Sequence, residues 1–182
     1  MKKQWIWLTL LLASCVSDMP QAAKDSVVQS VDANQYLGTW YEIARLDHSF
    51  ERGLEQVSAS YSLNDDGTIK VINKGYNAEK KQWKEAIGKA KFVDAPNADG
   101  TRTGRLKVSF FGPFYGEYNI IELDKPQYNY AMVSGGSEYL WILCRTPILA
   151  YPIKQHLIAQ AKQMGYPAEK LLFVKQITPP EK

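Results

Sequence analysis

The sequence has few of the residues on which many enzymes and metal sites depend. Its 182 residues include only two cysteines and two histidines, His48 and His156. Two cysteines are too few for a disulfide scaffold, and no spaced set of His and Cys indicates a metal site. No glycine-rich phosphate-binding motif and no G-x-S-x-G nucleophile motif occurs. The sequence therefore predicts a protein that is not an enzyme and that carries no metal or cofactor.

Long apolar runs and long basic runs are missing as well. The longest mainly apolar stretch, Trp5–Leu12, has eight residues, whereas a membrane-spanning helix needs about 20. The formal net charge is +3 and no Lys/Arg-rich run occurs, so nothing indicates nucleic-acid binding. By contrast, 45% of the residues are hydrophobic and 12% are aromatic. This composition suits one globular domain with a sizeable core.

The N-terminus has the features of an export signal. Met1–Lys3 is positively charged, the short apolar run follows, and small residues precede Cys15. Residues 12–15, Leu-Ala-Ser-Cys, resemble the lipobox of bacterial lipoproteins, in which the cysteine becomes the first mature residue and carries lipid. Val16 rather than Asp follows, which implies sorting to the outer membrane of a Gram-negative bacterium. We expect a signal peptide at 1–14 and acylation of Cys15, for example with palmitate; a buried N-terminal helix is the alternative.

Residues 15–34 are expected to form a lipidated, flexible tether. Polar residues break up any core pattern, and Val27, Val28 and Val31 are too few to form one. About twenty flexible residues span roughly 25 Å. The globular domain is then expected at 35–178, near the membrane surface but not embedded in it.

From Gly38 onward, short apolar strands alternate with turns. Runs rich in Val, Ile, Tyr, Phe and Trp show period-two alternation, and turn residues separate them. Eight strands are predicted, at 38–47, 54–63, 68–76, 82–93, 105–111, 115–124, 128–134 and 138–145. Consecutive hairpins give an up-and-down antiparallel order, and eight such strands can close into a β-barrel. An open sandwich is the alternative.

One α-helix follows the strands. Pro152 lies near its start and Gly165 ends it. Apolar residues recur between them at spacings of three and four, at Leu157, Ile158, Ala161 and Met164. This apolar stripe predicts that the helix packs on the outside of the barrel, and residues 171–174 form a short final strand. The fold class is therefore all-β, with one C-terminal helix.

Three separated features resemble the lipocalin family. Gly38-Thr-Trp40 matches its G-x-W motif on the first strand, and Arg145 closes the eighth strand, where the family places an arginine. Asp124 stands where many lipocalins have T-D-Y, although Leu and Lys replace its two neighbours. The resemblance runs from the lipobox to about Gln176. It implies an outer-membrane lipoprotein that binds a fatty acid or lysophospholipid, for storage, transport or maintenance of envelope lipid.

The motif residues also have a physical role in the predicted barrel. The first strand begins, and the eighth ends, at the same end of the barrel, and the two strands are neighbours across the closure. We therefore expect Trp40 and Arg145 to form a cation–π pair worth about 0.5–2 kcal/mol. With Gly38 and Asp124, this pair is expected to close one end of the barrel rather than to contact ligand.

Strand parity then predicts which side chains face the lumen. With Trp40 and Arg145 inward, alternate residues of the two strands are also inward, and lysines mark the outer face of the other strands. The predicted ligand-binding residues are Ala44, Val57, Val108, Phe110, Tyr115, Met132, Trp141 and Leu143. Such a cavity is apolar and nearly uncharged. A barrel filled by its own side chains is the alternative.

Aromatic residues occur in two loops expected at the open end. Phe50 follows the first strand, and residues 111–115, Phe-Gly-Pro-Phe-Tyr, follow the fifth. These side chains could guide an amphiphile, touch a membrane or form a homodimer. Two other functions stay open at this point. One is a carrier of another hydrophobic small molecule, such as a tetrapyrrole, and the other is an envelope protein-interaction module with a filled lumen.

Overall fold

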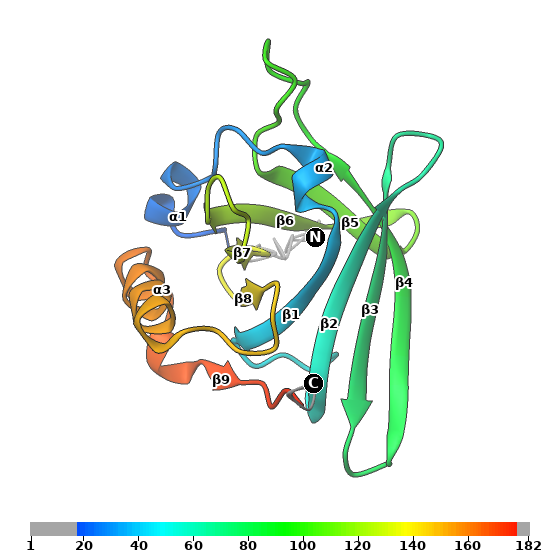
Figure 1. The fold of residues 1–182 in the computed structure, drawn as a ribbon, viewed down its shortest axis with the longest axis vertical. Coiled ribbons are helices and arrows are strands. Elements are labelled where there is room, and N and C mark those ends of the chain that lie inside the picture. The colour runs from blue at the N-terminus through cyan, green and yellow to red at the C-terminus, as the bar shows by residue number, and fades with distance from the viewer. Residues whose placement is uncertain (1–17, 178–182) are drawn as a thin grey trace, which may run out of the picture.

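Eight antiparallel strands close into a barrel in the computed structural model, which describes residues 18–177 (Figure 1). The strands are β1 (Gly38–Arg45), β2 (Leu54–Leu63), β3 (Ile69–Asn77), β4 (Gln82–Phe92), β5 (Arg105–Phe111), β6 (Phe114–Leu123), β7 (Tyr130–Ser134) and β8 (Leu140–Cys144). Each pairs with its sequence neighbour, and β1 pairs with both β2 and β8. The predicted barrel is confirmed, and the sandwich is excluded.

The C-terminal helix lies on the outside of the barrel, as predicted. Helix α3 (Tyr151–Gln163) packs beside the β7–β8 part of the wall (Figure 1). Its apolar stripe, Leu157 and Ala161, joins wall residues such as Ile142 in an outer hydrophobic core. A short 3₁₀ helix, η1 (Ala168–Lys170), leads to β9 (Leu172–Phe173), which pairs with the end of β1. No helix within 18–177 is long and apolar enough to cross a membrane.

Residues 18–34 differ from the flexible tether expected there. They form α1 (Gln21–Asp25) and the start of α2 (Ala33–Tyr36), and Ala23 and Val31 are fully buried. Val31 exchanges two backbone hydrogen bonds with Arg102, of 2.7 and 2.8 Å between N and O. These few apolar side chains are buried because they pack against other elements. Ala23 joins the core beneath α3, and Val31 joins the core that contains Trp40. Residues 1–17, with the predicted signal peptide and Cys15, lie outside the described part.

Strand β4 is much longer than its contact with β5. It pairs with β3 from Gln82 to Ala90, but with β5 only from Lys89 to Phe92. Among the described residues, none pairs with the other edge of 82–88. The β3–β4 hairpin accordingly extends beyond the rest of the barrel (Figure 1).

Candidate ligand-binding site

One end of the barrel is closed by Trp40 and Arg145. The guanidinium carbon of Arg145 lies 3.8 Å from the centre of the fully buried Trp40 ring. The guanidinium also donates hydrogen bonds to three backbone carbonyls, those of Gln35, Thr39 and Tyr128. Gly38 has a φ of +95°, and a Cβ there would lie 3.3 Å from Nη1 of Arg145. The arrangement therefore accounts for both the Gly and the Trp of the motif.

Asp124, the fourth motif residue, holds the neighbouring β6–β7 turn. Its carboxylate accepts a hydrogen bond from the backbone N–H of Asn129, and its carbonyl accepts one from Tyr128. The same Tyr128 carbonyl accepts from Arg145. Asp124 thus acts on the closed end through the turn backbone.

A cavity of about 700 Å³ occupies the barrel above this closed end. Its volume lies within the usual range of small-molecule sites, about 300–1,000 Å³. The lumen is therefore not filled by its own side chains. Six of the eight predicted ligand-binding residues line the cavity: Val57, Val108, Phe110, Tyr115, Trp141 and Leu143.

The prediction is wrong for Ala44 and Met132. Both are fully buried in the outer core beneath α3, with Ile142. A β-bulge explains why Ala44 faces outward. Glu42 pairs with Leu143 but Ala44 pairs with Ile142, so one extra residue in β1 reverses which side chains face the lumen. Met132 pairs with the same outward Ile142, and its neighbour Val133 lines the cavity instead.

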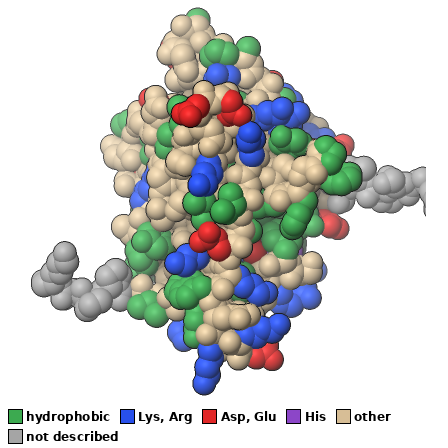
Figure 2. Space-filling view, turned by 90° about the vertical axis from the view of Figure 1, so that its right-hand side faces the viewer, with side chains coloured by type: hydrophobic (Ala, Val, Ile, Leu, Met, Phe, Trp, Pro, Cys, Tyr) green, Lys and Arg blue, Asp and Glu red, His purple; other side chains and the backbone are tan. Residues whose placement is uncertain are grey.

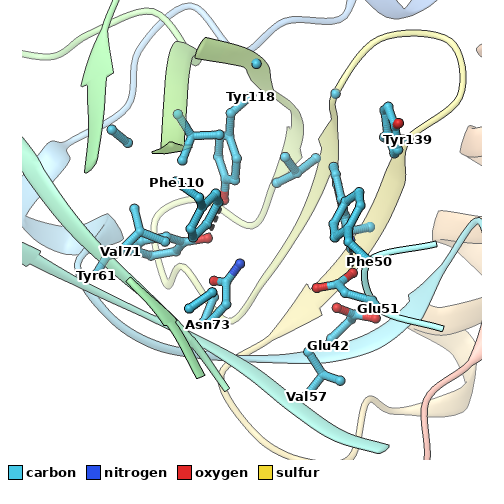
Figure 3. Close-up of a pocket in the computed structure, with 18 of the residues that line it drawn as sticks. Glu42, Phe50, Glu51, Val57, Tyr61, Val71, Asn73, Phe110, Tyr118 and Tyr139 are labelled. Atoms are coloured by element: carbon cyan, nitrogen blue, oxygen red, sulfur yellow. Dashed lines mark hydrogen bonds between the residues drawn. The ribbon is translucent and has the colours of Figure 1, made fainter. Parts of the chain in front are cut away.

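Three tyrosines form the floor of the cavity. The hydroxyl of Tyr118 lies 2.8 Å from that of Tyr36 and 2.9 Å from that of Tyr61 (Figure 3). Burial raises the pKa of Tyr61 to about 12, so the hydroxyl stays neutral and can donate. Sequence reasoning missed Tyr36 and Tyr118. The available signal for Tyr36 was its place two residues before the glycine of the G-x-W motif.

The cavity wall also carries a buried charged cluster, so it differs from the nearly uncharged lumen expected. Arg45 Nη1 donates to Glu42 Oε1 at 2.7 Å, and its Nη2 donates to the backbone carbonyl of Glu51 at 2.8 Å. Glu51 Oε2 lies 2.9 Å from His48 Nε2 and accepts from Trp141 Nε1 at 3.0 Å. The loop after β1 therefore folds back and places a second carboxylate beside Glu42 (Figure 3).

Burial and the neighbouring carboxylate control the protonation of Glu42. Desolvation is the larger effect and the charge of Glu51 is the next, and together they raise the pKa of Glu42 to about 8. Arg45 opposes this shift through its charge and its hydrogen bond. At neutral pH the Glu42 carboxyl therefore favours its protonated form, and this part of the wall can both donate and accept hydrogen bonds.

Aromatic side chains flank the cluster on the way to the open end. His48 stacks on Phe50 at 3.9 Å between ring centres, and Tyr139 stacks on Trp141 at 6.0 Å. On another wall, the buried Oδ1 of Asn73 has no hydrogen-bond partner among the described residues, and Asn73 lines the cavity. The site thus offers a long apolar surface and a few polar groups. Within 18–177, no group of His, Cys, Asp or Glu is placed to hold a metal ion.

A protein-family model identifies the class to which this chain belongs. The model of the Lipocalin-like domain matches residues 31–176. The chain belongs to the lipocalin family, a family of binding proteins, which agrees with the expectation that it is not an enzyme.

Within that family, the chain is similar to outer membrane lipoprotein Blc of Vibrio cholerae. The two are 50% identical over 172 residues, 94% of this chain and 96% of that protein. Blc of Escherichia coli K12 is 52% identical over 167 residues, 91% of this chain and 90% of that protein. Both relatives are named as outer membrane lipoproteins, in agreement with the localisation expected from the lipobox.

Solved structures agree on the fold. Apocrustacyanin C2 has a TM-score of 0.66 at 19% identity, covering 88% of this chain and 89% of its own. Insecticyanin from the tobacco hornworm Manduca sexta has a TM-score of 0.64 at 20% identity, covering 90% of this chain and 86% of its own. At these identities the likeness concerns the barrel alone.

Proposed function

We propose that this protein is a membrane-anchored carrier that holds a fatty acid or lysophospholipid in its barrel. Its role would be the storage, transport or maintenance of envelope lipid. The observation that carries the proposal is the 700 Å³ cavity, whose wall is mainly apolar and polar at a few places. An acyl chain suits the apolar part, because each buried CH₂ contributes about 0.8 kcal/mol.

The polar cluster supports a ligand with a head group rather than a pure hydrocarbon. Glu42, Glu51 and Asn73 line the cavity, and no described residue is a hydrogen-bond partner of the buried Asn73 Oδ1. A buried acceptor without a donor costs about 1–3 kcal/mol, so a hydroxyl, ammonium or protonated acid of the ligand would relieve that cost.

The membrane anchor is supported by the lipobox and by the Blc relatives, which are named outer membrane lipoproteins. Acylation of Cys15 would join the barrel to the outer membrane, with more than one acyl chain for a stable attachment. A protein-interaction module is less well supported, because it would favour a filled lumen.

Binding can be tested on purified, delipidated protein. Native mass spectrometry should detect a one-to-one complex with palmitate or with a lysophospholipid, and titration should change the tryptophan fluorescence at micromolar lipid. Trp141 lines the cavity, so Trp141→Phe should lose most of that change, whereas Trp83→Phe, on the exposed outer face of β4, should not. A wild type that binds neither lipid would refute the carrier, and bound colour after purification would favour a pigment.

A further inference from the structure

The barrel wall has a gap between β4 and the turn that joins β5 to β6. The strands are in contact at Gly88, where an added Cβ would lie 2.7 Å from the carbonyl oxygen of Ser109. Beyond that point β5 no longer pairs with β4, its pairing with β6 is irregular between Val108 and Phe111, and the chain enters β6 at Phe114. Among the described residues, no strand pairs with residues 82–87 of β4 on this edge.

The cavity lining includes residues on both sides of this gap. Lys84 and Ala86 line the cavity from β4, and Phe110, Phe114 and Tyr115 line it from β5, β6 and their turn. Residues on both sides of the gap therefore belong to the cavity lining.

The outer rim of the gap is apolar and exposed. Phe111 and Phe114 are 83% and 79% exposed, the two highest values among the large hydrophobic side chains of the described residues. Lys91 and Lys107 lie 5.3 and 5.4 Å from the ring of Tyr115. Figure 2 views this side of the molecule, where hydrophobic side chains lie among Lys and Arg. Exposed aromatics beside lysines suit an anionic lipid surface, which attracts the charges and accepts the rings.

An added β-strand from another protein fits this edge less well. The free edge of 82–88 has unpaired backbone groups, but Lys84 pairs with Gly75 and faces the cavity side. An inward-pointing charge on an edge strand is a common device against edge-to-edge pairing. The geometry therefore favours lipid over a protein strand.

We propose that the gap between β4 and the β5–β6 turn is a lateral portal, through which an acyl chain passes between the cavity and a bilayer that Phe111 and Phe114 contact. The proposal rests on the lipid-carrier function above. It adds the route of entry and the surface that docks on the membrane.

Transfer kinetics test the docking surface. A fluorescent fatty acid is loaded into vesicles that contain phosphatidylglycerol, and its movement into delipidated protein is followed by stopped flow. The double variant Phe111→Ser/Phe114→Ser should slow transfer roughly tenfold, since each 1.4 kcal/mol of lost membrane contact is a factor of ten. Because both side chains also line the cavity, the equilibrium affinity of the variant for the same fatty acid is measured in vesicle-free buffer, and the transfer rate should fall by a larger factor than that affinity. Ile148→Ser/Phe173→Ser, exposed apolar residues near α3 and β9, is the matched control and should transfer like wild type.

A second pair of variants tests the gap itself and keeps both phenylalanines. Ala86→Trp adds bulk on the cavity side of β4 and should slow both uptake and release. Ile87→Trp, on the exposed outer face of the same strand, should leave both rates unchanged.

Several outcomes would overturn the portal. Wild-type transfer rates in both the Phe111/Phe114 and the Ala86 variants would refute the portal without affecting the proposed carrier function. Conversion of a dimer to a monomer by the Phe111/Phe114 variant, without slower transfer, would assign the surface to a second copy of the chain. A wild type with no affinity for the fatty acid in vesicle-free buffer would instead remove the proposed function, and the portal with it.

Discussion

Arg45 donates a hydrogen bond of 2.7 Å to the Glu42 carboxyl on the wall of an otherwise mainly apolar cavity, and each side chain is only 4% exposed. Removing Glu42 would leave the buried Arg45 guanidinium without this acceptor, and an unsatisfied buried donor typically costs about 1–3 kcal/mol, more where the group is charged. The neighbouring Glu51 makes the site unusual, because three ionisable groups and His48 share one desolvated region. The pair therefore couples the stability of the barrel to proton binding inside it.

The stability of the barrel should depend on pH through Glu42. Its pKa is 4.5 in the unfolded chain and about 8 in the folded state, so between these values the folded state binds the extra proton. The free energy of unfolding should consequently fall as pH rises through this interval. In Glu42→Gln, urea unfolding should show a flatter pH dependence, because Gln cannot ionise but keeps an acceptor for Arg45. Glu79→Gln, on an exposed turn, should retain the wild-type slope; equal slopes in all three proteins would contradict the assignment.

The closed end should lose stability when either member of the cation–π pair is truncated. Trp40→Ala should cost about 3–5 kcal/mol, because Trp40 is fully buried. Arg145→Ala should also destabilise, since three backbone carbonyls lose their donor. A double-mutant cycle by denaturant unfolding should give a coupling of about 0.5–2 kcal/mol. Strict additivity would argue that the contact contributes nothing.

Two Trp substitutions should separate the outer core from the lumen. Ala44→Trp should destabilise the protein by more than about 1 kcal/mol, because Ala44 is fully enclosed between β1 and α3. Val57→Trp should instead fold and lose affinity for a fatty acid, because Val57 lines the cavity. Thermal unfolding and lipid titration on both variants provide the measurement. The opposite pattern would restore the simple alternation of β1.

Acylation of Cys15 should be visible in cells. A host fed labelled palmitate should incorporate the label into the wild-type protein and not into Cys15→Ser, which should be released as a soluble form. Cys144→Ser, at the buried free thiol, controls for a second modified cysteine and should remain labelled. Unlabelled, soluble wild-type protein would remove the anchor from the proposal.

The strands and the α3 helix could be predicted because their patterns are local. β2 and β5 have the predicted bounds, and the other strands differ by one or two residues at an end. The inward face of β1 could not be followed past Glu42, since the bulge depends on how β8 and β9 pair with it. Glu51 reaches the cavity from a loop, where no periodic pattern indicates direction. The burial of side chains in 18–34 was missed for a similar reason, because the core residues against which they pack belong to other parts of the chain.

The packing of α1 has a consequence for how far the barrel can move from the membrane. Met19, next to the first described residue, is already buried against the α3 core. If Cys15 is acylated, only two residues separate it from Asp18, a reach of about 10 Å in the most extended chain. The barrel would then stay within a few water layers of the headgroups.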